Sequence, residues 1–480
     1  MKRKFLLLLV GALLFSFLTG CNSENTSADK QNTEIPNIIW YYPGDNSADM
    51  EAVLAEANKI IKPAIGANLV LKYIDKGGYK EKMNMMVAAA EKFDICFVAN
   101  WSYDFYSNVS KSAFLSLDDL IAKHAPNLKK VLPDLMWNAV TIDQQVFAVP
   151  NYQILPVQHS LAMNKELENK YKFDFTNVKR LKDLEPYLDI LKTNEPSLYP
   201  YAPQRSEIDL DYEIVYPTDF IVIKKNDPSA KAYISYMLPE YQEHLKLMRN
   251  WYKKGYIRKD IVGSGNDTAS LLGLKYGLFW GTIKPGGEID NLQKFKKEIM
   301  DIPMCEPYIP TSASARALTV ISRTSPNPDK AIKMIELMHT NKELFNLLMF
   351  GLEGKNYNKV GDNVVETAVG NKYSLSPWMF GNQFNAYILK GQAENVWEKT
   401  KELNESSQYS PIWGFNFKLD NVKNEITQCT AVVKEYSFIT TGAEEPDTYY
   451  EEFMKKLEAA GVQKVLNEVQ RQIDQWKASN

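Results

Sequence analysis

The sequence has few cysteines and histidines, and it lacks the motifs of several large enzyme classes. Four cysteines and four histidines occur among 480 residues. No GxxxxGK[ST], GxGxxG, HExxH or GxSxG pattern is present, so nothing indicates a nucleotide-binding loop, a zincin site or a hydrolase elbow. Cys96, Cys305 and Cys429 follow Cys21 without any CxxC, and an odd number argues against a disulfide framework.

An excess of basic charge is also absent. The chain has 56 Lys and Arg against 59 Asp and Glu, and without the three cations at positions 2–4 the balance is 53 against 59, a net charge of about −6. This balance argues against a binder of nucleic acid or of anionic membrane surfaces. The histidines are scattered without a second ligand at metal spacing, and residues 209–213 alternate acids without the glycine of a calcium loop. We therefore expect no metal and no cofactor.

The first 21 residues contain the single long apolar run. Three cations are followed by apolar residues 5–17, a stretch too short to span a bilayer and typical of a secretory signal peptide. Residues 18–21 read Leu-Thr-Gly-Cys and resemble a bacterial lipobox. The resemblance implies that residues 1–20 are removed, that Cys21 carries diacylglycerol on its sulfur, and that the polar segment 21–35 is a tether at the extracellular face of the cell membrane. The alternative is a plain signal peptide with an incidental cysteine.

The remaining body, residues 36–480, is long enough for two or three domains, and its first part alternates strand and helix patterns. Strands are predicted at 37–42, 69–74 and 95–99, and a helix capped by Ser47 and stopped by Pro63 is predicted between the first two. The alternation restarts after Pro150, and helices dominate from residue 328, ending in a helix with an apolar stripe from 462 to 476. The pattern predicts an α/β fold with two lobes and a helical C-terminal part, and we expect ligands at the carboxyl ends of the strands.

Aromatic rings beside amides, carboxylates and hydroxyls recur at these predicted strand ends. A sugar presents an apolar C–H face and a rim of hydroxyls, so its site needs flat rings and hydrogen-bonding side chains. Packing in the core is the alternative for each ring, and Trp137, Trp251, Trp397 and Trp476 lie in helix-like stretches that favour it. The predicted ligand-binding residues are Trp40, Tyr42, Asp45, Asn100, Trp101, Asp104, Asn151, Tyr152, Gln153, Trp280, Lys284, Trp378 and Asn382.

Several stretches in a characteristic order resemble the solute-binding lipoproteins of bacterial ABC sugar importers. The stretches lie at 113–120, 124–127, 146–151, 184–186, 194–196, 251–257, 351–357, 380–383 and 414–415, and the resemblance extends over nearly the whole body. The chain is similar to the maltose-binding-protein class, and within it to the LipO-like branch with a C-terminal domain of unknown function. One departure is Gln144-Gln145, where relatives usually have Asp-Gly.

The resemblance implies a periplasmic-binding-protein-like fold with discontinuous lobes. The expected segments are 36–150 in lobe 1, 151–311 in lobe 2, 312–377 back in lobe 1, and 378–480 as the helical C-terminal part of lobe 2. It also implies a monomer without catalytic residues that captures an oligosaccharide and delivers it to membrane permease subunits driven by a separate ATPase. Two alternatives remain open: a surface-anchored glycan-processing enzyme, and a binder of a peptide or modified amino acid.

Overall fold

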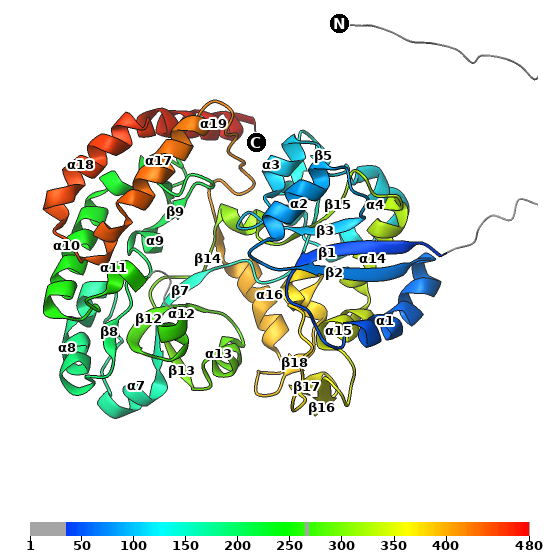
Figure 1. Cartoon of the computed structure of the whole chain (residues 1–480), viewed down its shortest axis with the longest axis horizontal. Helices are drawn as coiled ribbons and strands as arrows, with labels where there is room; N and C mark the ends of the chain where they lie inside the picture. Colours follow the sequence, from blue (N-terminus) through cyan, green and yellow to red (C-terminus); the bar gives the residue numbers. More distant parts are fainter. Residues whose placement is uncertain (1–34, 265–267, 480) are drawn as a thin grey trace, which may run out of the picture. The chain divides into compact units, whose positions relative to one another are not determined.

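The computed structural model describes residues 35–264 and 268–479, and the compact unit that it contains begins at Pro36 (Figure 1). The leader and Cys21 lie outside the described residues. No helix in these two ranges combines the length and apolarity that crossing a membrane requires. The apolar core divides into one large cluster built mainly from residues 38–155 and 309–386, and three clusters built from residues 161–304 and 412–473, which gives two lobes.

A five-stranded sheet in the order β2-β1-β3-β15-β6 forms the centre of the first lobe. β1 pairs in parallel with β2 and β3, whereas β15 runs antiparallel to β3 and β6. The chain therefore returns to this sheet after building most of the second lobe. The strands are β1 (Asn37–Pro43), β2 (Asn68–Ile74), β3 (Ile95–Val98), β6 (Val149–Pro150) and β15 (Leu318–Ile321).

Helices cover this sheet, and α1 (Met50–Ile65) shows why they pack there. Val53, Ala57 and Ile61 are fully buried at four-residue spacing, so one face of α1 enters the core. The other helices of this lobe are α2 (Tyr79–Ala88), α3 (Phe105–Ser110), α4 (Asp118–His124), α5 (Leu128–Val131), α6 (Asp134–Asn138), α14 (Pro328–Thr340) and α15 (Lys342–Phe350). Two short sheets complete it, with β4 (Thr141–Ile142) and β5 (Gln145–Val146) in one and β16 (Tyr357–Lys359), β17 (Val364–Thr367) and β18 (Ile388–Leu389) in the other.

Both predicted ends of α1 were wrong. Pro63 lies inside the last turn, and the helix ends two residues later, where Gly66 takes a left-handed φ of 66°. A proline in the last turn removes one hydrogen bond but keeps a helical φ, and a left-handed residue is what terminates a helix. At the other end Asp49 occupies the N-cap position without a side-chain bond, and the Ser47 hydroxyl instead accepts from the Ser374 backbone N–H at 3.4 Å.

The second lobe contains two sheets. One has the order β13-β7-β12-β8 and the other the order β11-β10-β9. The strands are β7 (Gln158–Asn164), β8 (Tyr199–Tyr201), β9 (Tyr212–Ile214), β10 (Ile221–Lys224), β11 (Ala232–Ile234), β12 (Tyr276–Ile283) and β13 (Ile299–Pro303). The helices are α7 (Lys165–Tyr171), α8 (Glu185–Asn194), α9 (Ile208–Asp211), α10 (Pro239–Lys254), α11 (Ile261–Ser264), α12 (Thr268–Leu272) and α13 (Gly287–Phe295).

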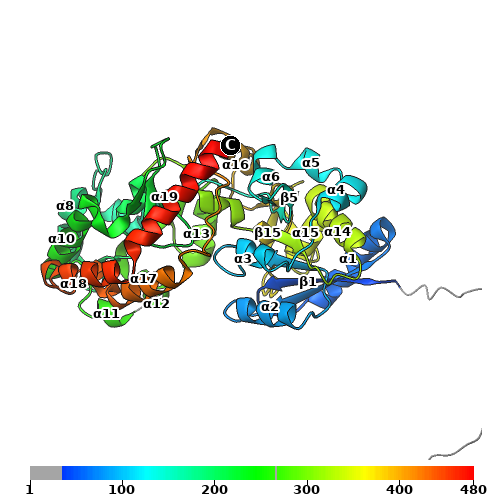
Figure 2. The ribbon, with the colours of Figure 1, turned by 90° about the horizontal axis from the view of Figure 1, so that it is seen from above.

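The C-terminal helices α17 (Lys423–Glu435), α18 (Pro446–Ala459) and α19 (Val462–Ser479) pack on the second lobe. Figure 2 shows α17 and α18 beside α10. Val462, Val465, Val469 and Ile473 are fully buried, which confirms the apolar stripe predicted for this segment. These residues share one core with β10 and β11, so the tail is part of the lobe and not an appendage.

Three segments connect the lobes, and a buried carboxylate of the second lobe holds one of them. Residues 151–157 link β6 to β7, residues 304–317 link β13 to β15, and α16 (Val396–Ser406) with β19 (Gln408–Tyr409) leads to α17. β19 pairs with β14 (Tyr308–Ile309). Glu213 of β9 is 5% exposed and accepts hydrogen bonds from the Tyr308 hydroxyl and the Thr311 backbone N–H, both at 2.6 Å. This carboxylate therefore fixes the hinge to the second lobe.

The third connection differs from the expected boundary at residue 378. Phe380 and Ala386 belong to the large cluster of the first lobe, and β18 still pairs with β17. The Phe380 ring lies 5.3 Å from the rings of both Trp40 and Tyr42. Aromatic packing thus holds residues 378–389 on the first lobe, and the chain leaves that lobe only through α16.

Candidate functional site

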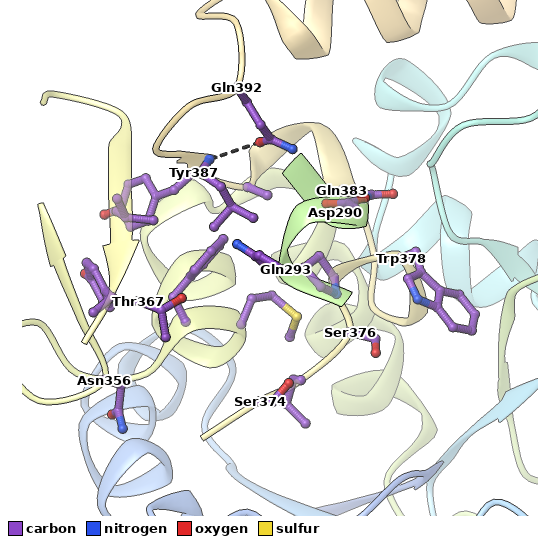
Figure 3. Close-up of a pocket in the computed structure, with 18 of the residues that line it drawn as sticks. Asp290, Gln293, Asn356, Thr367, Ser374, Ser376, Trp378, Gln383, Tyr387 and Gln392 are labelled. Carbon is purple, nitrogen blue, oxygen red and sulfur yellow. Dashed lines mark hydrogen bonds between the residues drawn. The ribbon is translucent and has the colours of Figure 1, made fainter. Parts of the chain in front are cut away.

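A hollow lined by both lobes, called here the main cavity, has a volume of about 630 Å³. The second lobe contributes the end of β12 and α13, and the first lobe contributes the β16–β17–β18 sheet and the loop that precedes Trp378. Figure 3 shows the Gln293 side chain reaching into this space from α13. The cavity has the size of a small-molecule site.

Six side chains offer free hydrogen-bonding groups to the main cavity. None of their side-chain polar atoms bonds to another described residue, and they are Gln293, Thr367, Lys372, Ser374, Ser376 and Gln383. Gln392 differs, because it accepts from the Leu389 backbone N–H at 3.0 Å and donates to the Gly286 carbonyl at 3.3 Å. The free groups can donate to and accept from hydroxyls of a ligand.

Two tryptophans form an aromatic platform at the edge of this cavity. Trp378 lines it, and its ring centroid lies 6.0 Å from that of Trp101 and 5.9 Å from that of Phe97 beneath. Trp101 is 55% exposed, and its indole N–H donates to the Arg316 carbonyl at 2.9 Å. This bond fixes the ring without covering it. The tryptophan platform, Trp101 and Trp378 over Phe97, is therefore a rigid apolar surface next to hydrogen-bonding groups.

Lys284 and Trp280 lie on the second lobe. Lys284 lines the main cavity and forms an ion pair with Asp290 at 2.5 Å. Asp290 is the one carboxylate among the described lining residues of this cavity. Trp280 is 7% exposed, and its indole N–H donates to the Tyr201 hydroxyl at 2.9 Å. It borders a separate open hollow of about 500 Å³ that also contains Arg205.

Two predicted residues on β1 are core residues. Trp40 is 1% exposed and Tyr42 is 3% exposed, and both rings pack against Phe380. Burial raises the pKa of Tyr42 to about 12. The interpretation of Trp40 as a ligand-stacking residue is therefore corrected, because a segment 340 residues further along the chain covers it. Tyr42 reaches only a smaller hollow, which it shares with the exposed Asp45.

Asn100 and Asp104 serve a contact between the lobes. The Asn100 side-chain amide donates to the Ser312 backbone carbonyl at 2.8 Å, and the Asn100 backbone carbonyl accepts from the Tyr216 hydroxyl. Asp104 caps α3 by accepting from the Ser107 backbone N–H at 2.7 Å, and it lies 3.3 Å from the same Tyr216 hydroxyl. Burial raises the pKa of the Asp104 carboxyl. Both side chains already have partners, so the structure does not place them in the main cavity.

The predicted residues of the first crossing are also buried, and they hold the connection together. Asn151 is 2% exposed, donates to the Met379 carbonyl and accepts from the Gly381 backbone N–H at 3.0 Å. The Tyr152 ring lies 4.5 Å from that of Phe384. The remaining two, Gln153 and Asn382, are 7% and 8% exposed. All four were predicted to bind a ligand, but their burial assigns them to structure.

Few sequence patterns mark the residues that do line the main cavity. Gln293 lies on an amphipathic helix, and Thr367 lies in a short strand of a three-stranded sheet that the sequence pattern did not predict. Gln383 belongs to the aromatic and amide cluster around Trp378, which was the available signal. No group of three or more potential metal ligands occurs in the described ranges. Burial lowers the pKa of His159 to about 4 and that of His339 to about 3, so both imidazoles are neutral at physiological pH.

Comparison with known proteins identifies the family. The chain is 32% identical over 473 residues to a carbohydrate ABC transporter substrate-binding protein of Streptococcus pneumoniae, covering 96% of this chain and 94% of the relative. Residues 411–478 match a domain of unknown function, DUF3502.

Similar solved structures point to the same family. The crystal structure of the N-glycan transport solute binding protein NgtS from S. pneumoniae matches with a TM-score of 0.84 at 30% identity, covering 92% of this chain and 98% of that one. Its complexes with Man1GlcNAc and Man5GlcNAc match with TM-scores of 0.75 and 0.73 at 29% and 30% identity, covering 92% and 93% of this chain and 99% of each of theirs. These findings confirm the resemblance seen in the sequence, and the chain belongs to the family of carbohydrate substrate-binding proteins of ABC transporters.

Proposed function

We propose that the protein captures an oligosaccharide in the main cavity and delivers it to a membrane permease. The tryptophan platform beside six free polar side chains is the observation that carries this proposal. One sugar ring would stack on Trp101 or Trp378, and its hydroxyls would pair with Gln293, Ser376 and their neighbours. A glycan of mannose and N-acetylglucosamine is the first ligand to test, because NgtS is crystallised with such glycans.

Capture would involve movement of the lobes. The chain resembles NgtS with a TM-score of 0.84 and the two glycan complexes with 0.75 and 0.73, although the identity is nearly constant. A lower overall similarity at equal identity is what a change in lobe arrangement produces. Three connecting segments and a cavity lined from both sides support closure about the hinge.

A binding role is favoured over catalysis by the carboxylates of the main cavity. Glycoside hydrolysis ordinarily requires two carboxyl groups facing the scissile bond. Among the described lining residues Asp290 is the single carboxylate, and it is paired with Lys284 at 2.5 Å. The relatives are substrate-binding transport proteins. The proposal therefore includes no chemical step.

Anchoring and partners extend the proposal beyond the described residues. Lipid attached to Cys21 would hold the monomer at the extracellular face of the membrane, and the segment 21–35 would give it reach. The family implies permease subunits and a separate ATPase as partners, which fits the absence of a nucleotide-binding loop in this sequence.

Isothermal titration calorimetry with Man5GlcNAc, Man1GlcNAc and a panel of other oligosaccharides tests the function. The proposal predicts saturable binding of at least one glycan with no release of reducing ends after prolonged incubation. Ligand at 100 times Kd should stabilise the fold by about 2.7 kcal/mol in a parallel thermal-shift measurement. Turnover of a glycan, or binding confined to peptides, would replace the proposal with one of the two alternative functions.

A further inference from the structure

A second, smaller hollow adjoins the main cavity on the first lobe. It has a volume of about 190 Å³ and lies beside the loop that follows β1. Lys372, Ser374 and Ser376 line both this hollow and the main cavity, so the two spaces share a wall. A sugar unit attached to a ligand in the main cavity can therefore reach it. We call it the lysine hollow; its charged lining residues are Asp45, Lys76 and Lys372.

The charges of the lysine hollow are not neutralised by the protein. Lys76 and Lys372 are exposed, and neither forms an ion pair or hydrogen bond with a described residue. Asp45, the single carboxylate of the described lining, also lacks an ion pair in the described ranges. The nearby lysine of the main cavity differs, because Lys284 is held by Asp290 at 2.5 Å. Two lysine side chains and one carboxylate therefore line the hollow, which gives it a net positive charge.

Hydroxyl groups complete the lining. The side chains of Ser374 and Ser376 have no hydrogen-bond partner among the described residues, and Ser47 presents a hydroxyl that accepts only a long 3.4 Å bond from the Ser374 backbone. Hydroxyl donors beside ammonium groups suit a carboxylate on a hydroxylated ring, because each carboxylate oxygen accepts several hydrogen bonds. A neutral sugar would leave the two ammonium groups without a counter-charge.

We propose that the lysine hollow is a subsite for a carboxylate-bearing sugar of the hexuronic acid type, attached to the oligosaccharide held in the main cavity. The inference rests on the proposed function, since it assumes an oligosaccharide in that cavity. Lys76 and Lys372 bind the carboxylate, and Asp45 weakens this binding by repulsion.

The test compares two ligands that differ in one group. A xylotetraose with a glucuronic acid branch and the same compound with its carboxyl reduced to an alcohol are titrated calorimetrically in low salt, with Man5GlcNAc as a neutral reference. We expect the acid to bind about three- to fivefold more tightly than its reduced form, as for an exposed ion pair. The preference should shrink at high salt.

Variants assign the preference to the hollow. Lys76→Gln with Lys372→Gln should abolish it, Asp45→Asn should increase it, and the exposed Lys92→Gln, which lies outside the hollow, should leave it unchanged. Equal binding of acid and reduced form overturns the inference, as does a preference that survives the double variant. Binding of Man5GlcNAc without binding of either xylan-derived compound also overturns it while the proposed function stands. Failure of every oligosaccharide to bind overturns the proposed function itself.

Discussion

Truncation of Trp101 separates ligand binding from folding more clearly than any other change in the platform. The Trp101 ring is 55% exposed. Trp101→Ala removes from the folded state one hydrogen bond to the Arg316 carbonyl and tilted ring contacts with Phe97 and Trp378. A hydrogen bond contributes about 1 kcal/mol and an aromatic pair about 1 kcal/mol. One hydrogen bond and two aromatic pairs are lost, so we expect a loss of about 3 kcal/mol in the free energy of unfolding and a moderate decrease in Tm for a chain of this size.

Trp101→Ala should also weaken sugar binding, and the Kd of the folded protein is measured separately from its stability. Aromatic anchors at binding sites cost more than ~2 kcal/mol when cut to alanine, which corresponds to roughly a thirtyfold increase in Kd. Calorimetry with the glycan that binds wild type gives the Kd, and differential scanning calorimetry gives the Tm. Trp101→Phe should retain most of the affinity, because it keeps an aromatic face and loses only the indole bond.

Trp251→Ala is the matched control. Trp251 is fully buried, so its truncation should cost about 3–5 kcal/mol of folding stability and leave the Kd of the folded protein unchanged. Unchanged affinity in Trp101→Ala, with Trp378→Ala also unchanged, would refute the platform as the sugar-binding surface.

Three further predictions concern the hinge, the platform loop and the anchor. Burial raises the pKa of Glu213 above its usual value, so the stability that this shift contributes is complete below the pKa of the unfolded state and is lost as pH rises through the pKa of the folded state. The difference in Tm between wild type and Glu213→Gln should therefore fall from pH 4 to pH 7, and a difference that stays constant would contradict this prediction. Gly381→Ala should lower both Tm and sugar affinity, because φ is 61° and a Cβ would lie 2.5 Å from the Met338 carbonyl oxygen. Gly354→Ala is the control: its φ is 78° but a Cβ would meet no atom within 4 Å, so it should lose only about 1 kcal/mol of folding stability. Equal losses of stability in the two variants would refute the clash. Cys21→Ala should abolish metabolic labelling with palmitate in cells, and label that persists in this variant would refute the lipobox interpretation.

The regular elements could be predicted because their patterns are local. The stripe at 462–473 identifies a helix face, and the fully apolar strand around Cys96 identifies the centre of a sheet, since each depends on neighbours a few residues away. Gly255 likewise ends α10 with a φ of 77° as its position indicates.

The site could be predicted only in part, because exposure depends on distant segments. Trp40 and Trp101 both have a tyrosine close by near a predicted strand end, yet Phe380 packs on the first, whereas the second is 55% exposed. Gln293 and Thr367 meet across the main cavity from different lobes, and no local pattern marks that meeting. Trp101, Trp378 and Lys284 are the predicted residues that the structure leaves in place for a ligand.

The crystal structure of the protein with its bound oligosaccharide tests the central claim most directly. The account predicts a sugar ring stacked on Trp101 or Trp378, hydroxyls bonded to Gln293 and Ser376, and lobes closer together than in the structure described here. Density for the sugar elsewhere, for example in the hollow beside Trp280 with the main cavity empty, would contradict it.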